Sequence, residues 1–113
     1  MKVHIIGGGN LGVSIALGLA RFSKDNQITV TRRNTTSILH LEELGITVSK
    51  DNKHNIQEAD VIILTIKPYQ VDTVLAEILP VISNKVIASG VSGLSIENLQ
   101  KKIGDSNVAI RIM

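Results

Sequence analysis

The amino-terminal segment is the part of this chain that most constrains its fold. A short apolar run, Val3 to Ile6, breaks into Gly7, Gly9 and Gly12, and a helical pattern without proline follows. In a strand–turn–helix unit the first glycine allows a sharp turn, the second lets a pyrophosphate approach the backbone, and the third lets the helix pack close to the strand. The free N–H groups and positive dipole end of the helix favour an anion. This pattern predicts a dinucleotide-binding turn; the alternative is a glycine-rich turn without a ligand.

Strand and helix patterns alternate along the rest of the chain. We predict strands at 3–6, 28–31, 46–48, 61–66, 86–89 and 108–112, helices at 10–22, 36–44, 70–79 and 95–103, and an irregular turn near 52–58. The continuous apolar run at 61–64 is typical of a strand buried on both faces of a parallel sheet. The predicted fold is α/β: a Rossmann-like, doubly wound, mostly parallel sheet with helices on both faces and strand order 3-2-1-4-5-6.

Length and composition fit one domain spanning residues 1–113, with 43% hydrophobic residues, a net charge of +2 and no cysteine. The two basic doublets, at 32–33 and 101–102, have no interleaved aromatic residues. We therefore expect no nucleic-acid partner. No apolar run approaches the roughly 20 residues of a membrane span, and we expect no signal peptide before the first strand. We expect no membrane association and a cytoplasmic location.

The end of the second predicted strand indicates which dinucleotide is bound. An NAD-binding fingerprint places an acidic residue there, about 20 residues after the glycines, for the ribose 2′-hydroxyl. This chain instead has Thr31, Arg32 and Arg33. Two guanidinium groups and a hydroxyl would bind a 2′-phosphate, whereas a carboxylate would repel it. The segment favours NADP(H) over NAD(H); the alternative is a solvated turn with two incidental arginines.

The ends of the fourth and fifth predicted strands are further candidates, because ligands of open α/β sheets bind at the carboxyl ends of strands. Thr65, Lys67 and Pro68 follow the fourth strand, and Ser89 ends the fifth. These residues would face the nicotinamide half of a cofactor. The alternatives are a helix-start turn at 67–68 and a flexible connection at 89–93.

No catalytic or metal-binding constellation is found in the sequence. His4 is expected to be a satisfied core or edge histidine, and His40 and His54 are expected to be solvated. The histidines have no metal-ligand spacing. Asp60 is expected to be structural, and no nucleophile lies beside a base. We therefore assign no catalytic residue and no metal ligand.

Four blocks, in this order and spacing, resemble one family. They are Ile5–Gly12, Ala59–Pro68, Ile87–Ile96 and Arg111–Met113. Together they resemble the amino-terminal half of pyrroline-5-carboxylate reductase across essentially the whole chain. Ser92 replaces the family's usual small alanine, and Arg32 replaces a commoner asparagine.

The resemblance implies a role for each candidate residue. It implies pyrophosphate contacts for Gly7, Gly9, Asn10 and Leu11, 2′-phosphate contacts for Thr31, Arg32 and Arg33, an adenosine-ribose contact for Asn52, and nicotinamide-side contacts for Thr65, Lys67, Pro68 and Ser89. The implied cofactor is NADP(H), with NAD(H) as the second candidate.

The resemblance also implies a reaction and a missing part. The reaction is hydride transfer from the nicotinamide to the C=N carbon of a small-molecule substrate, 1-pyrroline-5-carboxylate, which gives proline. The family's helical carboxyl-terminal domain, which forms the homo-oligomer and most of the substrate pocket, is expected to be absent from this chain. We therefore expect these residues alone to turn over no substrate.

Two other functions remain open. One is the nucleotide-binding domain of a related oxidoreductase, of the deazaflavin-dependent NADP reductase or hydroxyacid dehydrogenase type. The other is a stand-alone nucleotide-sensing regulatory domain. Such sensors usually keep an acidic residue at the end of the second strand, where this chain has arginines.

Overall fold

Six parallel strands form one sheet in a computed structural model that describes residues 1–112. Their order, β3-β2-β1-β4-β5-β6, is the predicted order. The strands are β1 (Lys2–Ile6), β2 (Gln27–Thr31), β3 (Thr47–Ser49), β4 (Val61–Leu64), β5 (Val86–Ser89) and β6 (Val108–Arg111). Of the block Arg111–Met113, the last residue lies outside the described part of the chain.

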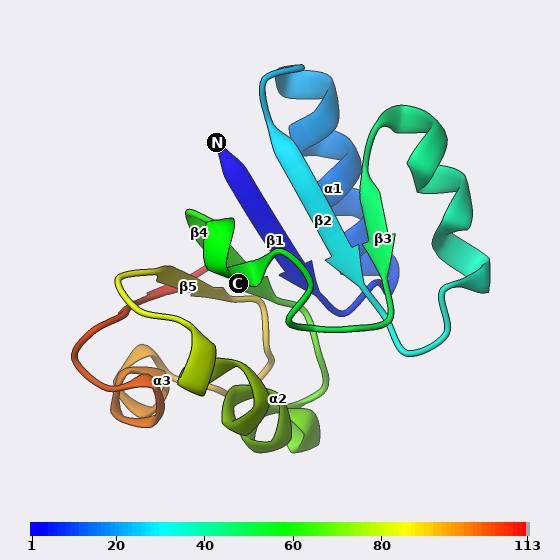
Figure 1. Ribbon diagram of the computed structural model, residues 1–113. Helices are drawn as coiled ribbons and strands as arrows, with labels where there is room; N and C mark the ends of the chain where they lie inside the picture. The colour runs from blue at the N-terminus through cyan, green and yellow to red at the C-terminus, as the bar shows by residue number, and fades with distance from the viewer. Residues whose placement is uncertain (113) are drawn as a thin grey trace.

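Helical segments cover both faces of this sheet (Figure 1). The three α-helices described are α1 (Asn10–Phe22), α2 (Val71–Ile78) and α3 (Ile96–Ile103), and the 3-10 helices are η1 (Thr36–Leu44), η2 (Ile56–Glu58), η3 (Pro68–Gln70) and η4 (Leu79–Val81). Helices α1 and η1 pack on one face, and α2 and α3 on the other. The doubly wound α/β prediction is confirmed. Within residues 1–112, no helix has the length and apolar character needed to cross a membrane.

The central strand β4 shows why both faces need covering. Ile62 and Leu64 are fully buried in the core beneath α2 and α3. Ile63 points the other way, into the core beneath α1 and η1. Successive side chains of a strand point to opposite faces, so this continuous apolar run forms part of both cores.

The segment at 36–44 is helical, as predicted, but it is a 3-10 helix. Its two buried residues, Ile38 and Leu41, are three positions apart, which matches the three residues per turn of this helix type. Gly45 ends the helix in the left-handed conformation, with φ of 80°. These two side chains, one helical turn apart, pack this short helix against the sheet.

The fourth strand ends at Leu64, two residues earlier than predicted. At the next residue, the Thr65 N–H still donates to the Ile6 carbonyl of β1 at 2.9 Å, and its hydroxyl donates to the Gly7 carbonyl at 2.7 Å. The end of β4 is therefore hydrogen-bonded both to β1 and to the glycine turn that follows β1.

The polar side chains of β1 and β2 share the sheet face that α1 does not cover. His4 is paired with Thr29 and Ile6 with Thr31, so His4, Thr29 and Thr31 point to the same side. All three are buried. The connection from β3 to β4 passes over this face, and Asn52 in that connection bonds both His4 and Thr31.

His4 is a core histidine, as expected, but only one of its ring nitrogens is satisfied. Its side chain is 1% exposed, and Nε2 lies 2.8 Å from the carbonyl oxygen of Asn52. Nδ1 is buried without a hydrogen-bond partner among the residues described. Burial lowers the pKa of His4 to about 4; the bond to Asn52 and the charge of Asp51 oppose this shift, and His54 adds to it. His40 and His54 are exposed, as expected.

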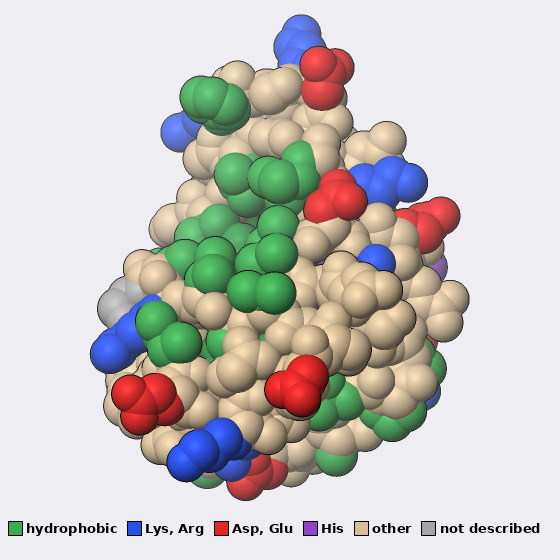
Figure 2. Space-filling view, turned by 90° about the vertical axis from the view of Figure 1, so that its left-hand side faces the viewer, with side chains coloured by type: hydrophobic (Ala, Val, Ile, Leu, Met, Phe, Trp, Pro, Cys, Tyr) green, Lys and Arg blue, Asp and Glu red, His purple; other side chains and the backbone are tan. Residues whose placement is uncertain are grey.

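The edge strand β6 exposes apolar side chains on its α1 side. Val108, Ile110 and Ile112 are 57%, 41% and 45% exposed, whereas Ala109 between them is buried. Figure 2 looks onto this edge of the sheet and shows hydrophobic side chains gathered in a band. Contiguous exposed apolar surface is typical of an interaction site.

Replacing Gly7 by alanine should destabilise the fold. Gly7 has φ of +106°, and a Cβ there would lie 2.5 Å from the Thr65 carbonyl oxygen. We expect Gly7→Ala to lower the free energy of unfolding by at least about 2 kcal/mol, measured by urea denaturation. Gly18→Ala is the matched control, because a Cβ at Gly18 meets no atom within 4 Å. That variant should gain roughly 0.5–1 kcal/mol, and an equal loss in both would contradict the assignment.

The stability of the protein should fall as the pH drops from 6.5 to about 4. The pKa of His4 in the folded protein lies below the ordinary histidine value of 6.5, so the unfolded chain takes up a proton in this window and the folded protein does not. The shift corresponds to a loss on the order of 3 kcal/mol at most. Chemical denaturation across this pH range should show that His4→Gln removes this component. His40→Gln should retain it, and identical pH profiles for both variants would contradict the prediction.

Candidate functional site

The glycine turn after β1 is tied to both neighbouring strands. The Gly7 N–H donates to the Thr31 carbonyl at 3.0 Å, and the Gly7 carbonyl accepts from the Thr65 hydroxyl at 2.7 Å. A Cβ at Gly12 would overlap the Gly7 carbonyl oxygen, so this glycine allows α1 to begin directly against the turn. The roles predicted for Gly7 and Gly12 in the backbone are therefore confirmed.

Gly9 is different, because space is open in front of it. Its φ of −81° suits any residue, and a Cβ there would meet no protein atom within 4 Å. Helix α1 starts at the next residue, without a side-chain cap and without an acidic residue in its first turn. Its first N–H groups are therefore available to an anion placed over Gly9.

A cleft of about 700 Å³ opens at the carboxyl ends of β1, β2 and β4. The sequence-predicted residues that line it are Gly7, Gly9, Thr31, Arg32, Arg33, Asn52, Thr65 and Lys67. The fold thus brings together eight candidates that lie far apart in the chain. Four others, Asn10, Leu11, Pro68 and Ser89, do not line it.

These four residues occupy different places around the cleft. Asn10 and Leu11 are exposed in the first turn of α1, and Pro68 is exposed at the start of η3. Ser89 is only 2% exposed, and its hydroxyl accepts the Val91 N–H at 3.1 Å. Its side chain stabilises the turn after β5, and its proposed nicotinamide contact stays a prediction.

The charge of the cleft is mostly positive. Arg32, Arg33 and Lys67 line it, against one carboxylate, Glu77. The Arg32 guanidinium donates to the Gly8 carbonyl at 3.0 Å and to the Ser37 hydroxyl at 2.8 Å, so it links the glycine turn to η1. No hydrogen bond or ion pair holds the exposed Arg33 side chain within residues 1–112. This arrangement suits a phosphorylated ligand.

Asn52 lines the cleft and is hydrogen-bonded to two buried residues. The Thr31 hydroxyl donates to Asn52 Oδ1 at 2.6 Å, and His4 Nε2 lies 2.8 Å from the Asn52 carbonyl. Because Thr31 is fully buried, it supports Asn52 from below. Its direct contact with a 2′-phosphate stays a prediction.

Two contributors to the site were missed in the sequence. Gly8 is buried, and a Cβ there would come within 2.9 Å of Ile38 Cδ1, so the middle glycine lets η1 approach the turn. Tyr69 lines the cleft while 82% exposed. The run of three glycines could have indicated Gly8. The position of the single tyrosine directly after Pro68 is only a weak signal for Tyr69.

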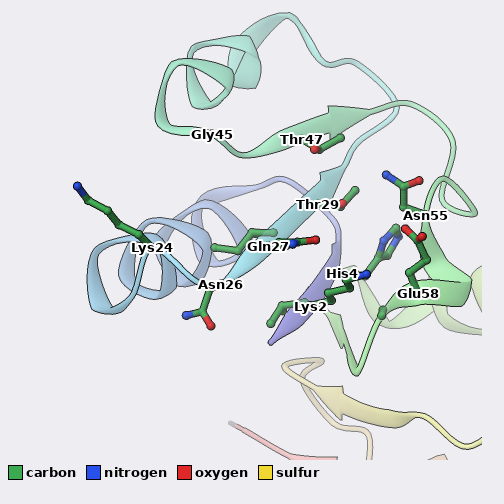
Figure 3. A pocket seen from close by; sticks show the side chains of 13 residues that line it. Lys2, His4, Lys24, Asn26, Gln27, Thr29, Gly45, Thr47, Asn55 and Glu58 are labelled. Atoms are coloured by element: carbon green, nitrogen blue, oxygen red, sulfur yellow. The ribbon is translucent and has the colours of Figure 1, made fainter.

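A second cavity, of about 350 Å³, lies at the opposite, amino-terminal edge of the strands. In Figure 3, Lys2, His4 and Glu58 point into it from β1 and η2. It carries neither the glycine turn nor the N-terminus of an α-helix among the described residues. No group of three or more metal-ligating side chains occurs among the described residues. The cleft at the carboxyl edge is therefore the candidate site.

Comparison with known proteins places this chain in a family. Residues 2–93 match the family described as NADP oxidoreductase, coenzyme F420-dependent. Pyrroline-5-carboxylate reductase 1 of Dictyostelium discoideum is 35% identical over 98% of this chain and 21% of its own length. The Staphylococcus haemolyticus reductase is 32% identical over 100% of this chain and 44% of its own length.

A solved structure agrees with these sequence relatives. The pyrroline-5-carboxylate reductase of Coxiella burnetii matches with a TM-score of 0.87 and 29% identity, over 98% of this chain and 43% of that chain. The chain thus spans less than half the length of these relatives. The resemblance to pyrroline-5-carboxylate reductases is confirmed, and the chain belongs to the family of NADP oxidoreductases described as coenzyme F420-dependent.

Proposed function

We propose that this chain is the NADP-binding domain of a pyrroline-5-carboxylate reductase. The observation that carries the proposal is the open space over Gly9, at the uncapped start of α1 and beside Arg32 and Arg33. A pyrophosphate fits where no Cβ intrudes, and the arginines provide charge for a 2′-phosphate about one nucleotide away.

Different residues of the cleft would bind different parts of the cofactor. Gly7, Gly9 and the first-turn N–H groups of Asn10 and Leu11 would hold the pyrophosphate. Arg32 and Arg33 would bind the 2′-phosphate, with Thr31 behind them and Asn52 at the adenosine ribose. On the β4 side, Lys67 lines the cleft and Thr65 holds the glycine turn, so the nicotinamide half would extend toward them, with Pro68 and Ser89 nearby.

Bound NADPH would supply a hydride for the C=N carbon of 1-pyrroline-5-carboxylate, and the product would be proline. The residues of this chain bind and orient the cofactor; none is assigned a proton transfer. We propose that a helical domain completes the substrate pocket and the homo-oligomer, and that these 113 residues alone turn over no substrate. The exposed apolar side chains of β6 support such a contact.

A second candidate follows from the family description, which names coenzyme F420. In that case the same NADP site would exchange a hydride with a deazaflavin. The two candidates differ in the second substrate and share the nucleotide site. Joining this domain to a helical carboxyl-terminal domain of the family and assaying it with either acceptor distinguishes them, because only one acceptor should oxidise NADPH.

The protein should bind NADPH more tightly than NADH. We expect Arg33→Ala to remove a charge-assisted bond worth about 1.5–3 kcal/mol, which weakens NADPH binding roughly 10- to 100-fold. NADH binding should change little. Isothermal titration calorimetry at matched salt measures both. Arg21→Ala, in the last turn of α1, is the control for lost net charge. Equal affinity of the unmodified protein for both cofactors would contradict the 2′-phosphate assignment.

Replacing Gly9 by valine should abolish binding of both cofactors without unfolding the protein. The new side chain meets no protein atom close to its Cβ but occupies the place proposed for the pyrophosphate. Calorimetry gives the binding, and a melting curve verifies the fold. Gly18→Val is the matched control, since its Cβ also meets no atom. A folded Gly9→Val protein with normal affinity would show that the turn holds no pyrophosphate.

A further inference from the structure

Asn52 is held in the cleft by hydrogen bonds to two different strands. Its backbone carbonyl lies 2.8 Å from His4 Nε2 on β1, and its side-chain Oδ1 accepts the Thr31 hydroxyl of β2 at 2.6 Å. Asn52 itself belongs to the connection between β3 and β4. Two buried side chains thus restrain a residue that itself lies outside the helices and strands.

The protonation state of His4 keeps its Nε2 a hydrogen-bond donor to Asn52. A carbonyl oxygen accepts only, so His4 Nε2 carries the hydrogen and donates it. The other nitrogen, Nδ1, is buried without a partner in the described part of the chain, and a proton there would be poorly solvated. The lowered pKa of His4 agrees, and the ring remains neutral near pH 7.

The remaining polar group of the Asn52 side chain is its amide nitrogen. Oδ1 is occupied by Thr31, and Nδ2 has no hydrogen bond to any residue within 1–112. Asn52 lines the same cleft as Arg32 and Arg33. An amide held at two points therefore offers its free N–H donors beside the proposed phosphate-binding arginines.

We propose that His4 is a positioning residue for the nucleotide: through the Asn52 carbonyl it orients the Asn52 amide toward the adenosine-ribose oxygens that NADPH and NADH share. The inference rests on the proposed function of the cleft. Figure 3 shows the His4 ring projecting from β1 beside Asn55, in the connection that carries Asn52. His4 thus supports the cleft from beneath without lining it.

Calorimetry on His4→Leu and His4→Gln tests this role. Leucine removes the donor, and we expect roughly five- to tenfold weaker binding of both NADPH and NADH. Glutamine can place an amide N–H at the position of Nε2, so it should restore binding to within about twofold. Weakening of NADPH alone, or no weakening with leucine, would overturn the proposal. His40→Leu, an exposed histidine of η1, is the control.

A double-mutant cycle separates positioning from a general loss of structure. Asn52→Ala keeps the carbonyl that His4 binds but removes the amide, so adding His4→Leu to it should weaken binding less than about twofold further. Additive losses, or failure of His4→Gln to restore binding, would assign His4 a structural role only. Melting curves verify that each variant is folded.

Binding to the unmodified protein distinguishes the proposed function from the positioning role of His4. If the unmodified protein binds neither dinucleotide, the proposed function fails and the role of His4 fails with it. If the unmodified protein binds NADPH and His4→Leu binds equally well, only the positioning role is overturned.

Discussion

The close contact between the glycine turn and the end of β4 is the constraint on which this structure depends. The Thr65 N–H and hydroxyl donate to the Ile6 and Gly7 carbonyls, and the Gly7 N–H donates to Thr31. Three strands therefore end against one another at a single point. Only a residue without a Cβ fits there, because Gly7 has a positive φ and faces the Thr65 carbonyl at close range. The cleft opens directly above this contact.

The uneven covering of the sheet determines where polar side chains accumulate. One face of β1 and β2 carries Val3, Ile5, Ile28 and Val30 beneath α1 and η1. The opposite face carries His4, Thr29 and Thr31, and the β3–β4 connection passes over it. Buried polar groups need partners, and Asn52 is the partner of His4 and Thr31, which links the interior of the sheet to the proposed nucleotide cleft. The candidate site is therefore connected to buried polar side chains of the sheet, not to purely apolar ones.

Much of the fold could be predicted from local patterns, and the differences have identifiable causes. The apolar run of β4 and the glycine spacing led directly to strand order and layers. Segment 36–44 was placed at its observed bounds, but its 3-10 geometry follows from how Ile38 and Leu41 reach the sheet. Strand β4 ends where its neighbour β1 ends, and Thr65 after it is hydrogen-bonded to residues 58 and 59 positions away. Such distant partners leave no periodic trace in the sequence.

The sequence by itself determined the α/β class, the place of the glycine turn and the cationic end of β2, because each depends on neighbouring residues and on strand alternation. Only the tertiary structure decided which of those residues are free to bind. It left Gly9 and Arg33 open, turned Ser89 toward Val91, and buried Thr31 beneath Asn52. It also brought His4 to Asn52 across 48 positions. The reason is physical: burial and hydrogen-bond partners are properties of packed neighbours, and those neighbours come from distant parts of the chain.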